Sequence, residues 1–362
     1  MTGAQSPAPA RELWAQALDE GINVFGAGGF ARSVASAVRA RGVEVHALLV
    51  SRDIADIWED IPIRGADAAA LERAPTWIGV FNREAHSDYS SLRSQLAGVS
   101  GAARLVWPQD FYELLQRELG WRFWLHALGD YTEAAAQQSA ARNLLEDEES
   151  RAAFDAVLQF RRSASSHWKS PAPSADLQYM PAWLRSAIRE PLRIVDAGAY
   201  RGETLRELAT VVTVERAWTF EPDPENYAAL VRNMADWNTP ITHVPAGLSD
   251  RAAMAGFTAG LGEASNVGSG GNSFVPMVAL DECLHRAPVN FLKLDVEGHE
   301  LAALQGARNT LLRERPALAV AAYHRWDDLW RIPAFIEALN LNYRLRFRLH
   351  AHNSFDGVFY AY

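Results

Sequence analysis

Several apolar runs in the C-terminal half of the chain end in side chains that carry charge or titrate. In an open α/β sheet the carboxyl ends of parallel strands meet at one edge, and ligands bind there. A buried charged group without a partner costs several kcal/mol or shifts its pKa, so a purely structural sheet has no use for several of them. We therefore expect a ligand site built from the groups that follow these runs: Asp196, Glu221, Asp295, Glu297 and His324.

Each of these groups, taken alone, also has a structural interpretation. Asp196 and Asp295 each precede a predicted helix and can cap it. His324 can be a strand-end histidine that bonds to a neighbour. The case for a ligand site comes from their occurrence together, at the ends of four strands.

The first of these strands indicates which ligand the site takes. Asp196 stands before Gly198 and Gly202 in a strand-to-helix turn, where glycine lets the backbone approach a ligand closely. Glu221 ends the next strand, where a carboxylate accepts ribose hydroxyls. This pair also suits NAD. An acid before the first glycine suits a cationic ligand better than a pyrophosphate, however. S-adenosylmethionine, with its ammonium and sulfonium groups, is such a ligand.

Five strings between residues 192 and 316 make this interpretation more specific. They are Val195-Asp-Ala-Gly-Ala, Thr219-Phe-Glu-Pro-Asp-Pro-Glu-Asn226, Gly247-Leu-Ser-Asp250, Phe291-Leu-Lys-Leu-Asp-Val-Glu-Gly-His-Glu300 and Leu304-Gln-Gly-Ala307. Together they resemble the FkbM family of S-adenosylmethionine-dependent O-methyltransferases. The resemblance implies methyl transfer to a hydroxyl of a sugar, glycan or natural product. By position, it implies that Asp196 and Gly198 contact the methionine portion, Glu221 the ribose, and Ser249 and Asp250 the adenine.

Methyl transfer to a hydroxyl is helped by a base or a metal that relieves the acceptor of its proton. His324 is the preferred base because imidazole titrates near neutral pH, and Asp295 is the second choice. Lys293 lies two residues before Asp295, so strand alternation puts both on one face. There the lysine can pair with Asp196 or Asp295, or orient the acceptor; otherwise it is a surface lysine.

Asp295, Glu297 and His324 also form a carboxylate–imidazole set of the kind that binds a divalent ion. No sequence spacing forces these three side chains to converge. A metal at this position is therefore an open alternative to a simple base.

The N-terminal part carries a second glycine-rich turn. The pattern Gly26-x-Gly28-x-x-Ala31 follows an apolar run, as in dinucleotide-binding folds, and Asp53 near the next strand end can take the ribose. The turn also resembles the small Rossmann-like domain that precedes PglD-type sugar acyltransferases, where it accommodates a nucleotide-linked sugar. Two interpretations stay open: a domain that binds a nucleotide or nucleotide-sugar, and a docking or dimerising module that has lost its ligand. The second is compatible with a homodimer.

Composition narrows the partners and the location. The chain has 362 residues, 49% of them hydrophobic and 22% charged, which is ordinary globular composition. A net charge of −9 argues against a nucleic-acid partner. We expect no membrane span, and no signal peptide in the opening residues, so the expected location is cytoplasmic. Cys283 is the single cysteine, which excludes a disulfide framework.

The expected architecture is α/β: two Rossmann-like doubly wound domains joined by a helical connector, the second a class I methyltransferase sheet that closes with an antiparallel hairpin. The expected divisions are a loose tail (1–17), a nucleotide-binding-type domain (18–110), the connector (111–185) and the methyltransferase domain (186–362).

The loop Gly260–Ser273, which is rich in glycine, is predicted to be a mobile lid or acceptor loop, or else a surface insertion. Two other functions compete with methyl transfer. One is an NAD(P)-linked oxidoreductase that acts on a nucleotide-sugar, and the other is a non-catalytic two-domain scaffold.

Overall fold

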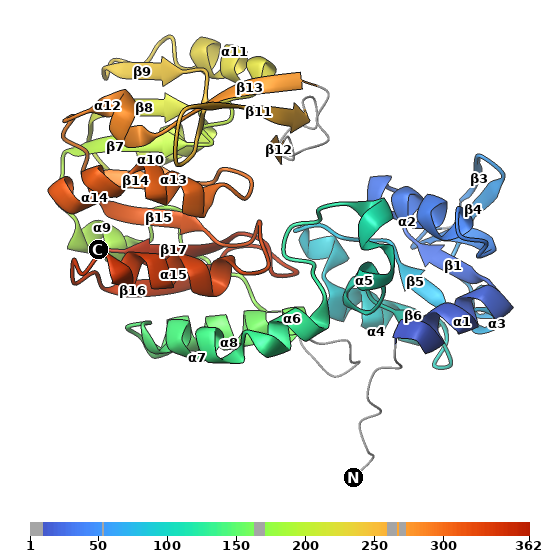
Figure 1. Cartoon of the computed structure of the whole chain (residues 1–362). Helices are drawn as coiled ribbons and strands as arrows, with labels where there is room; N and C mark the ends of the chain where they lie inside the picture. Colours follow the sequence, from blue (N-terminus) through green and yellow to red (C-terminus); the bar gives the residue numbers. More distant parts are fainter. Residues whose placement is uncertain (1–9, 53, 163–170, 259–265, 268–272) are drawn as a thin grey trace. The chain divides into compact units, whose positions relative to one another are not determined.

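The computed structural model describes residues 10–362, apart from 53, 163–170, 259–265 and 268–272, and divides into two compact units (Figure 1). Unit 1 comprises the described residues of Met1–Ala135, Asp155–Ala172 and Ala351–Phe355. Unit 2 comprises those of Ala136–Phe154, Pro173–His350 and Asp356–Tyr362. No described helix is long and apolar enough to cross a membrane.

These divisions differ from the predicted ones in the connector. Residues 111–185 are largely helical, as expected, but they are shared between the two units. Phe111, Leu115 and Trp124 lie in the hydrophobic core of unit 1. The first part of the expected connector therefore belongs to the N-terminal fold.

Unit 1 contains a six-stranded sheet in the order β3-β4-β2-β1-β5-β6, parallel throughout except for the β3–β4 pair. The apolar run 76–81 predicts one strand, but β5 ends at Ile78, next to Gly79, against which helix α2 packs. The elements are α1 Ala10–Glu20, β1 Ile22–Phe25, α2 Gly29–Arg39, β2 Val45–Val50, β3 Ala55–Trp58, β4 Ile61–Gly65, α3 Ala68–Arg73, β5 Thr76–Ile78, α4 Tyr89–Val99, β6 Leu105–Val106, α5 Pro108–Leu119 and α6 Leu128–Glu133.

Unit 2 contains a seven-stranded sheet in the order β9-β8-β7-β14-β15-β17-β16. All neighbours are parallel except β17, which runs antiparallel to β15 and β16, so the predicted hairpin is present. The central strands β14 and β15 are buried throughout, as strands covered on both faces must be. The strands are β7 Leu192–Ala197, β8 Val214–Phe220, β9 Ile241–Val244, β14 Phe291–Leu294, β15 Ala317–Ala321, β16 Leu345–Leu349 and β17 Gly357–Ala361.

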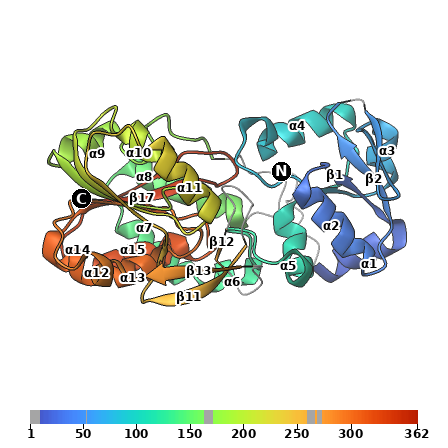
Figure 2. The ribbon, with the colours of Figure 1, turned by 90° about the horizontal axis from the view of Figure 1, so that it is seen from above.

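Helices cover both faces of this sheet. Figure 2 shows α9, α10 and α11 on one side and α12 to α15 on the other, which is the layering of a doubly wound fold. The α/β fold class predicted from the sequence is confirmed. The helices of unit 2 are α7 Ala135–Asn143, the beginning of α8 Glu148–Arg162, α9 Ala182–Ala187, α10 Glu203–Leu208, α11 Pro224–Asn233, α12 Leu280–Leu284, α13 Glu300–Gly306, α14 Arg308–Glu314 and α15 Asp328–Ala338.

Two features of unit 2 differ from the expected elements. The single helix predicted after β14 is broken into α13 and α14, and the Asp281 carboxylate accepts hydrogen bonds from the backbone N–H groups of Asn309 and Thr310 at the start of α14. A small sheet in the order β10-β13-β11-β12 was not predicted. Its strands are β10 Gly247–Leu248, β11 Ala253–Thr258, β12 Asn266–Val267 and β13 Ser273–Val278.

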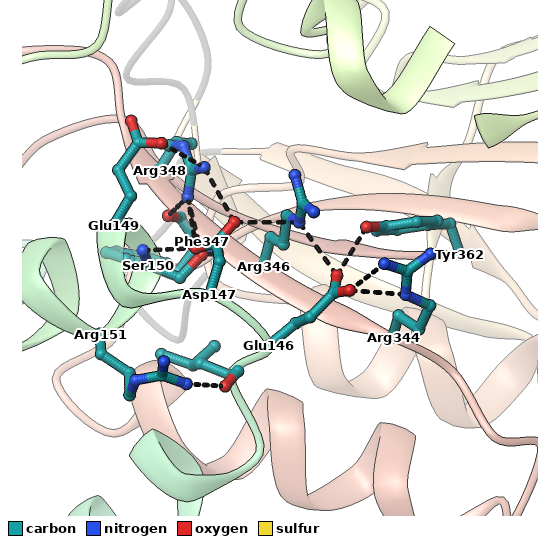
Figure 3. Close-up of polar contacts among 11 residues, drawn as sticks. Glu146, Asp147, Glu149, Ser150, Arg151, Arg344, Arg346, Phe347, Arg348 and Tyr362 are labelled. Atoms are coloured by element: carbon teal, nitrogen blue, oxygen red, sulfur yellow. Dashed lines mark hydrogen bonds and ion pairs between the residues drawn. The ribbon is translucent and has the colours of Figure 1, made fainter. Parts of the chain in front are cut away.

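An ion-pair network covers the outer edge of the main sheet of unit 2 (Figure 3). The Phe347 backbone N–H, on edge strand β16, donates to the Ser150 hydroxyl of α8 at 3.0 Å. The buried Arg348 guanidinium donates to the same hydroxyl at 2.7 Å and to Glu149 at 2.7 Å. An unpaired strand edge invites pairing with another chain, and here the Ser150 hydroxyl and the Glu146 N–H each bond to a backbone group of β16.

Replacing Arg348 should therefore destabilise unit 2 far more than replacing a neighbouring arginine at the surface. Arg348 is 3% exposed, and its loss removes the bond to Ser150 and the charge-assisted hydrogen bonds to Asp147 and Glu149, each of which contributes about 1.5–3 kcal/mol. Arg344, which is 58% exposed and paired with Glu146, contributes no more than about 1 kcal/mol. Chemical denaturation of Arg348→Met beside Arg344→Met checks this expectation. Equal losses in the two variants would contradict it.

Candidate functional site

The structure brings the predicted strand-end residues to one edge of the unit 2 sheet. Asp196 lies within β7, Glu221 directly follows β8, Asp295 directly follows β14, and His324 follows β15. Because β8, β7, β14 and β15 are successive neighbours, the four groups lie along the carboxyl edge. Neither aspartate caps a helix: α10 begins after Gly202 and α13 after His299.

A buried ion pair joins the two central strands. Lys293 on β14 lies opposite Asp196 on β7, and its Nζ atom is 3.0 Å from Asp196 Oδ1. The two side chains are 1% and 0% exposed, so Lys293 is not a surface lysine. Of the two partners considered for it, the lysine contacts Asp196. Neither Asp196 oxygen receives a well-directed hydrogen bond from the described residues, so attraction between charges dominates the contact.

The same lysine holds the turn that follows β7. Its Nζ donates to the carbonyl oxygens of Gly198 at 2.6 Å and Ala197 at 3.2 Å. Gly198 has φ +71°, and a Cβ atom there would overlap the backbone oxygen of Asp295. The turn therefore requires glycine, both for its backbone conformation and for its contact with the end of β14.

Glu221 lies beside this turn and is also held by backbone. Its carboxylate accepts hydrogen bonds from the N–H groups of Tyr200 and Asp223, each at 2.9 Å. Burial raises the pKa of Glu221 to about 7, against the lowering effect of these bonds. Glu221 is 6% exposed. The two backbone hydrogen bonds fix the position of its carboxylate, and because its pKa is near 7 its charge changes with pH near neutrality.

Ser249 and Asp250 follow β10, and the Ser249 hydroxyl donates to Asp250 at 3.2 Å. Helix α13 packs directly on this segment, because a Cβ on Gly306 would overlap the Ser249 carbonyl oxygen. Ser249 is buried, whereas Asp250 is exposed and pairs with Arg251 at 3.2 Å.

At the other end of the site, His324 is surrounded by carboxylates. Its Nε2 atom lies 3.4 Å from Asp295 Oδ1 and 3.4 Å from Glu297 Oε2, and its Nδ1 atom lies 2.8 Å from Glu300 Oε1. His324 and Glu300 are completely buried. The three candidates predicted for base or metal chemistry thus do converge.

The carboxylates decide the charge of this histidine. Burial alone lowers the pKa of His324, but Glu300, Glu297 and Asp295 outweigh that effect and raise it to about 10. Asp328, buried behind the cluster, has its pKa raised to about 8 by burial and by Glu300. With only protein around it, His324 is therefore an imidazolium at neutral pH, and not the free base that its ordinary pKa suggested.

Three residues of the site were missed by sequence reasoning. The Tyr179 hydroxyl donates to Asp295 Oδ2 at 2.7 Å, and its ring lies 5.2 Å from Lys293 Nζ. The Tyr323 hydroxyl donates to Asp295 Oδ1 at 3.4 Å. Glu300 is the last residue of the string that contains Asp295, so its position in the sequence could have indicated that it belongs to the site. Tyr179 lies in a segment before β7, where no sequence pattern indicates a role in the site.

In unit 1, Gly26 and Gly28 lie in the turn between β1 and α2. Gly26 has φ +121°, and a Cβ atom there would lie 3.0 Å from the Gly79 oxygen, so it serves a tight turn. Gly28 is the N-cap of α2, with open space around it. Asp53 and most of the predicted lid, Gly260–Ser273, lie outside the described residues; of the lid, only β12 and Ser273 are described.

Comparison with known proteins decides what kind of domain carries these residues. The family model described as Methyltransferase FkbM domain matches residues 196–349. Residues 196–349 form an FkbM methyltransferase domain. The FkbM domain begins at Asp196 and includes Glu221, Lys293, Asp295, Glu300 and His324.

One solved structure supports the fold, and two others are similar only over a smaller part of it. The structure of Methyltransferase FkbM from Methylobacillus flagellatus KT matches with a TM-score of 0.74 and 21% identity, covering 98% of this chain and 92% of that one. Precorrin-6y C5,15-methyltransferase from Geobacter metallireducens matches with a TM-score of 0.32 and 13% identity, covering 53% of this chain and 93% of that one. TrmK of M. capricolum, solved with S-adenosyl-homocysteine, matches with a TM-score of 0.30 and 9% identity, covering 49% of this chain and 64% of that one. No protein of curated function matches the chain. The likeness of unit 1 to the PglD-type domain stays a prediction.

The buried ion pair of the FkbM domain gives a direct prediction. Lys293→Met should lower the free energy of unfolding by about 3–5 kcal/mol, because it leaves the Asp196 carboxylate buried without its partner. The double variant Lys293→Met, Asp196→Asn should recover much of this loss, since it removes both charges. Denaturant unfolding of the two variants measures the difference. A double variant no more stable than the single one would contradict this account of the pair.

Lys293→Arg separates charge from shape. Arginine keeps the positive charge, but its planar guanidinium does not fit a site made for a compact ammonium with three acceptors. We expect the Lys293→Arg variant to be destabilised nearly as much as Lys293→Met. Wild-type stability in Lys293→Arg would show that this lysine has no special role.

Proposed function

We propose that this protein transfers the methyl group of S-adenosylmethionine to a hydroxyl group of a sugar, glycan or natural-product acceptor. The observation that carries the proposal is the edge of the FkbM domain, where a glycine turn and a buried carboxylate lie beside a carboxylate–imidazole cluster. The first two suit a charged nucleoside ligand, and the cluster suits a weakly acidic hydroxyl.

In this proposal the cofactor lies along the ends of β7 and β8. The Gly198 turn and Asp196 face its methionine portion, where a carboxylate attracts the ammonium group. Glu221 accepts the two ribose hydroxyls, because its position is already fixed by the N–H groups of Tyr200 and Asp223. Ser249 and Asp250 lie at the adenine. Lys293 is a positioning residue that keeps the turn in place through the Gly198 carbonyl.

The acceptor hydroxyl lies at Asp295. The side chain of Asp295 is 23% exposed, whereas His324 behind it is completely buried, so Asp295 is the group that an incoming hydroxyl can reach. In the transfer, the bond from sulfur to the methyl carbon breaks as the bond from that carbon to the acceptor oxygen forms. The sulfonium becomes a neutral thioether, and the hydroxyl proton passes to the Asp295 carboxylate. His324 supports the carboxylate from behind.

Unit 1 is proposed to bind a nucleotide or nucleotide-sugar at the Gly26–Gly28 turn. Its support is the open space around Gly28 at the start of α2, where an anionic group meets backbone N–H groups. Nucleotide-sugars are accordingly the first acceptors to try. Nothing in the described site favours the oxidoreductase over methyl transfer.

Glu221 makes cofactor binding depend on pH. The pKa of Glu221 is raised to about 7, so the carboxylate is ionised above that pH and neutral below it. The ionised form accepts the ribose hydroxyls more strongly. Calorimetric titration of the full chain with S-adenosylhomocysteine should therefore show an affinity that falls by up to about tenfold per unit as the pH drops below 7. Glu221→Gln should bind more weakly and without this dependence.

The matched control is Glu215→Gln, which changes a half-exposed carboxylate on the same strand. It should bind like the wild type at every pH. Two results would overturn the placement of the cofactor: no binding of S-adenosylhomocysteine by the wild type, or an unchanged affinity in Glu221→Gln.

A further inference from the structure

Atoms of the kinds that bind divalent metal ions meet at His324. Nε2 of His324 lies 3.4 Å from Asp295 Oδ1 and 3.4 Å from Glu297 Oε2. Donor atoms about 2.1 Å from a small divalent cation lie about 3 Å apart, which is near this spacing.

The opposite side of the ring is fixed. Nδ1 lies 2.8 Å from Glu300 Oε1, and that oxygen also accepts the Val296 N–H at 2.8 Å. A histidine that binds a metal usually donates its other N–H to such a carboxylate, which sets the tautomer and turns the lone pair toward the ion. Here Glu300 presents Nε2 of His324 to Asp295 and Glu297.

The carboxylates around the ring belong to one cluster of possible ligand atoms. One donor atom from each of Asp295, Glu300 and His324 lies within 4.8 Å of the other two. Glu300 and His324 are completely buried, so the inner part of this cluster is shielded from water.

The exposure of the cluster gives such an ion an open side. His324 forms the buried floor, whereas the side chains of Asp295 and Glu297 are 23% and 21% exposed. A cation held by these three would keep its remaining coordination positions toward solvent. An acceptor hydroxyl can enter there.

We propose that Asp295, Glu297 and Nε2 of His324 bind a divalent cation of the Mn²⁺ or Mg²⁺ type, with Glu300 as the residue that orients His324. Two carboxylates and one imidazole suit these ions, and their open positions suit an oxygen ligand. The role of the cation rests on the proposed function: it would hold the acceptor oxygen and favour its deprotonated form. Asp295 would then serve first as a ligand.

Binding of Mn²⁺ to the full-length chain, freed of metal with a chelator, tests the site without any methyl transfer. Electron paramagnetic resonance of free Mn²⁺ should show one ion bound per chain. Asp295→Asn, Glu297→Gln and His324→Gln should each weaken binding at least tenfold, and Glu300→Gln about 10- to 100-fold, as expected for a residue that orients a ligand. Glu337→Gln, an exposed carboxylate on α15, is the control and should bind like the wild type.

Titration of each variant with S-adenosylhomocysteine shows whether it is folded, since the cofactor contacts proposed above lie on β7 and β8. It also separates the two proposals, because cofactor binding can succeed where metal binding fails. Absence of Mn²⁺ binding at millimolar concentration, or binding that is equally strong in all four site variants, would overturn the metal site. His324 would then be an imidazolium held by three carboxylates, and Asp295 a simple base.

Discussion

The site depends on one buried ion pair at the centre of the sheet. Lys293 and Asp196 lie on adjacent strands, both out of contact with water, and the lysine also binds the carbonyl oxygens of Ala197 and Gly198. A buried charge needs a partner of opposite charge, and these two groups are each other's partners. The pair therefore ties the end of β14 to the turn after β7. The positions of the glycine turn and of Asp295 follow from it.

The same constraint divides the site into two halves. On the side of β7 and β8, charge is compensated within the protein: Asp196 faces Lys293, and Glu221 is held by backbone N–H groups. On the side of β14 and β15, carboxylates outnumber cations, and with only protein around it His324 takes up a proton in response. A preorganised half thus lies beside a half that attracts positive charge. This is the arrangement needed to hold a cofactor in place and to draw a proton from an acceptor.

Much of this edge could be predicted from the sequence because parallel strands carry their chemistry at their ends. Asp196, Glu221, Asp295 and His324 each follow an apolar run, and the sheet order brings them together. Lys169 and Lys293 are the only lysines among the 35 basic residues of the sequence. Lys293 proved to be the buried partner of Asp196, whereas Lys169 lies outside the described residues.

What could not be predicted depends on contacts between distant segments. Tyr179 reaches Asp295 from a segment before β7, and no local pattern announces that contact. Strand β13 was missed because its apolar residues alternate with exposed ones and Pro276 interrupts them. The charge of His324 was also out of reach. It depends on three carboxylates around one ring, and sequence spacing alone does not show that they converge.

The central claim is that the acceptor half of this edge performs methyl transfer. Incubation of the full chain with S-adenosylmethionine labelled at the methyl carbon and a panel of nucleotide-sugars, glycans and other hydroxyl compounds tests it directly. The wild type should place the label on an acceptor oxygen, and Asp295→Asn should transfer at least 100-fold less although it still binds S-adenosylhomocysteine. Equal transfer by Asp295→Asn, or label on a nitrogen or carbon of the acceptor, would contradict it.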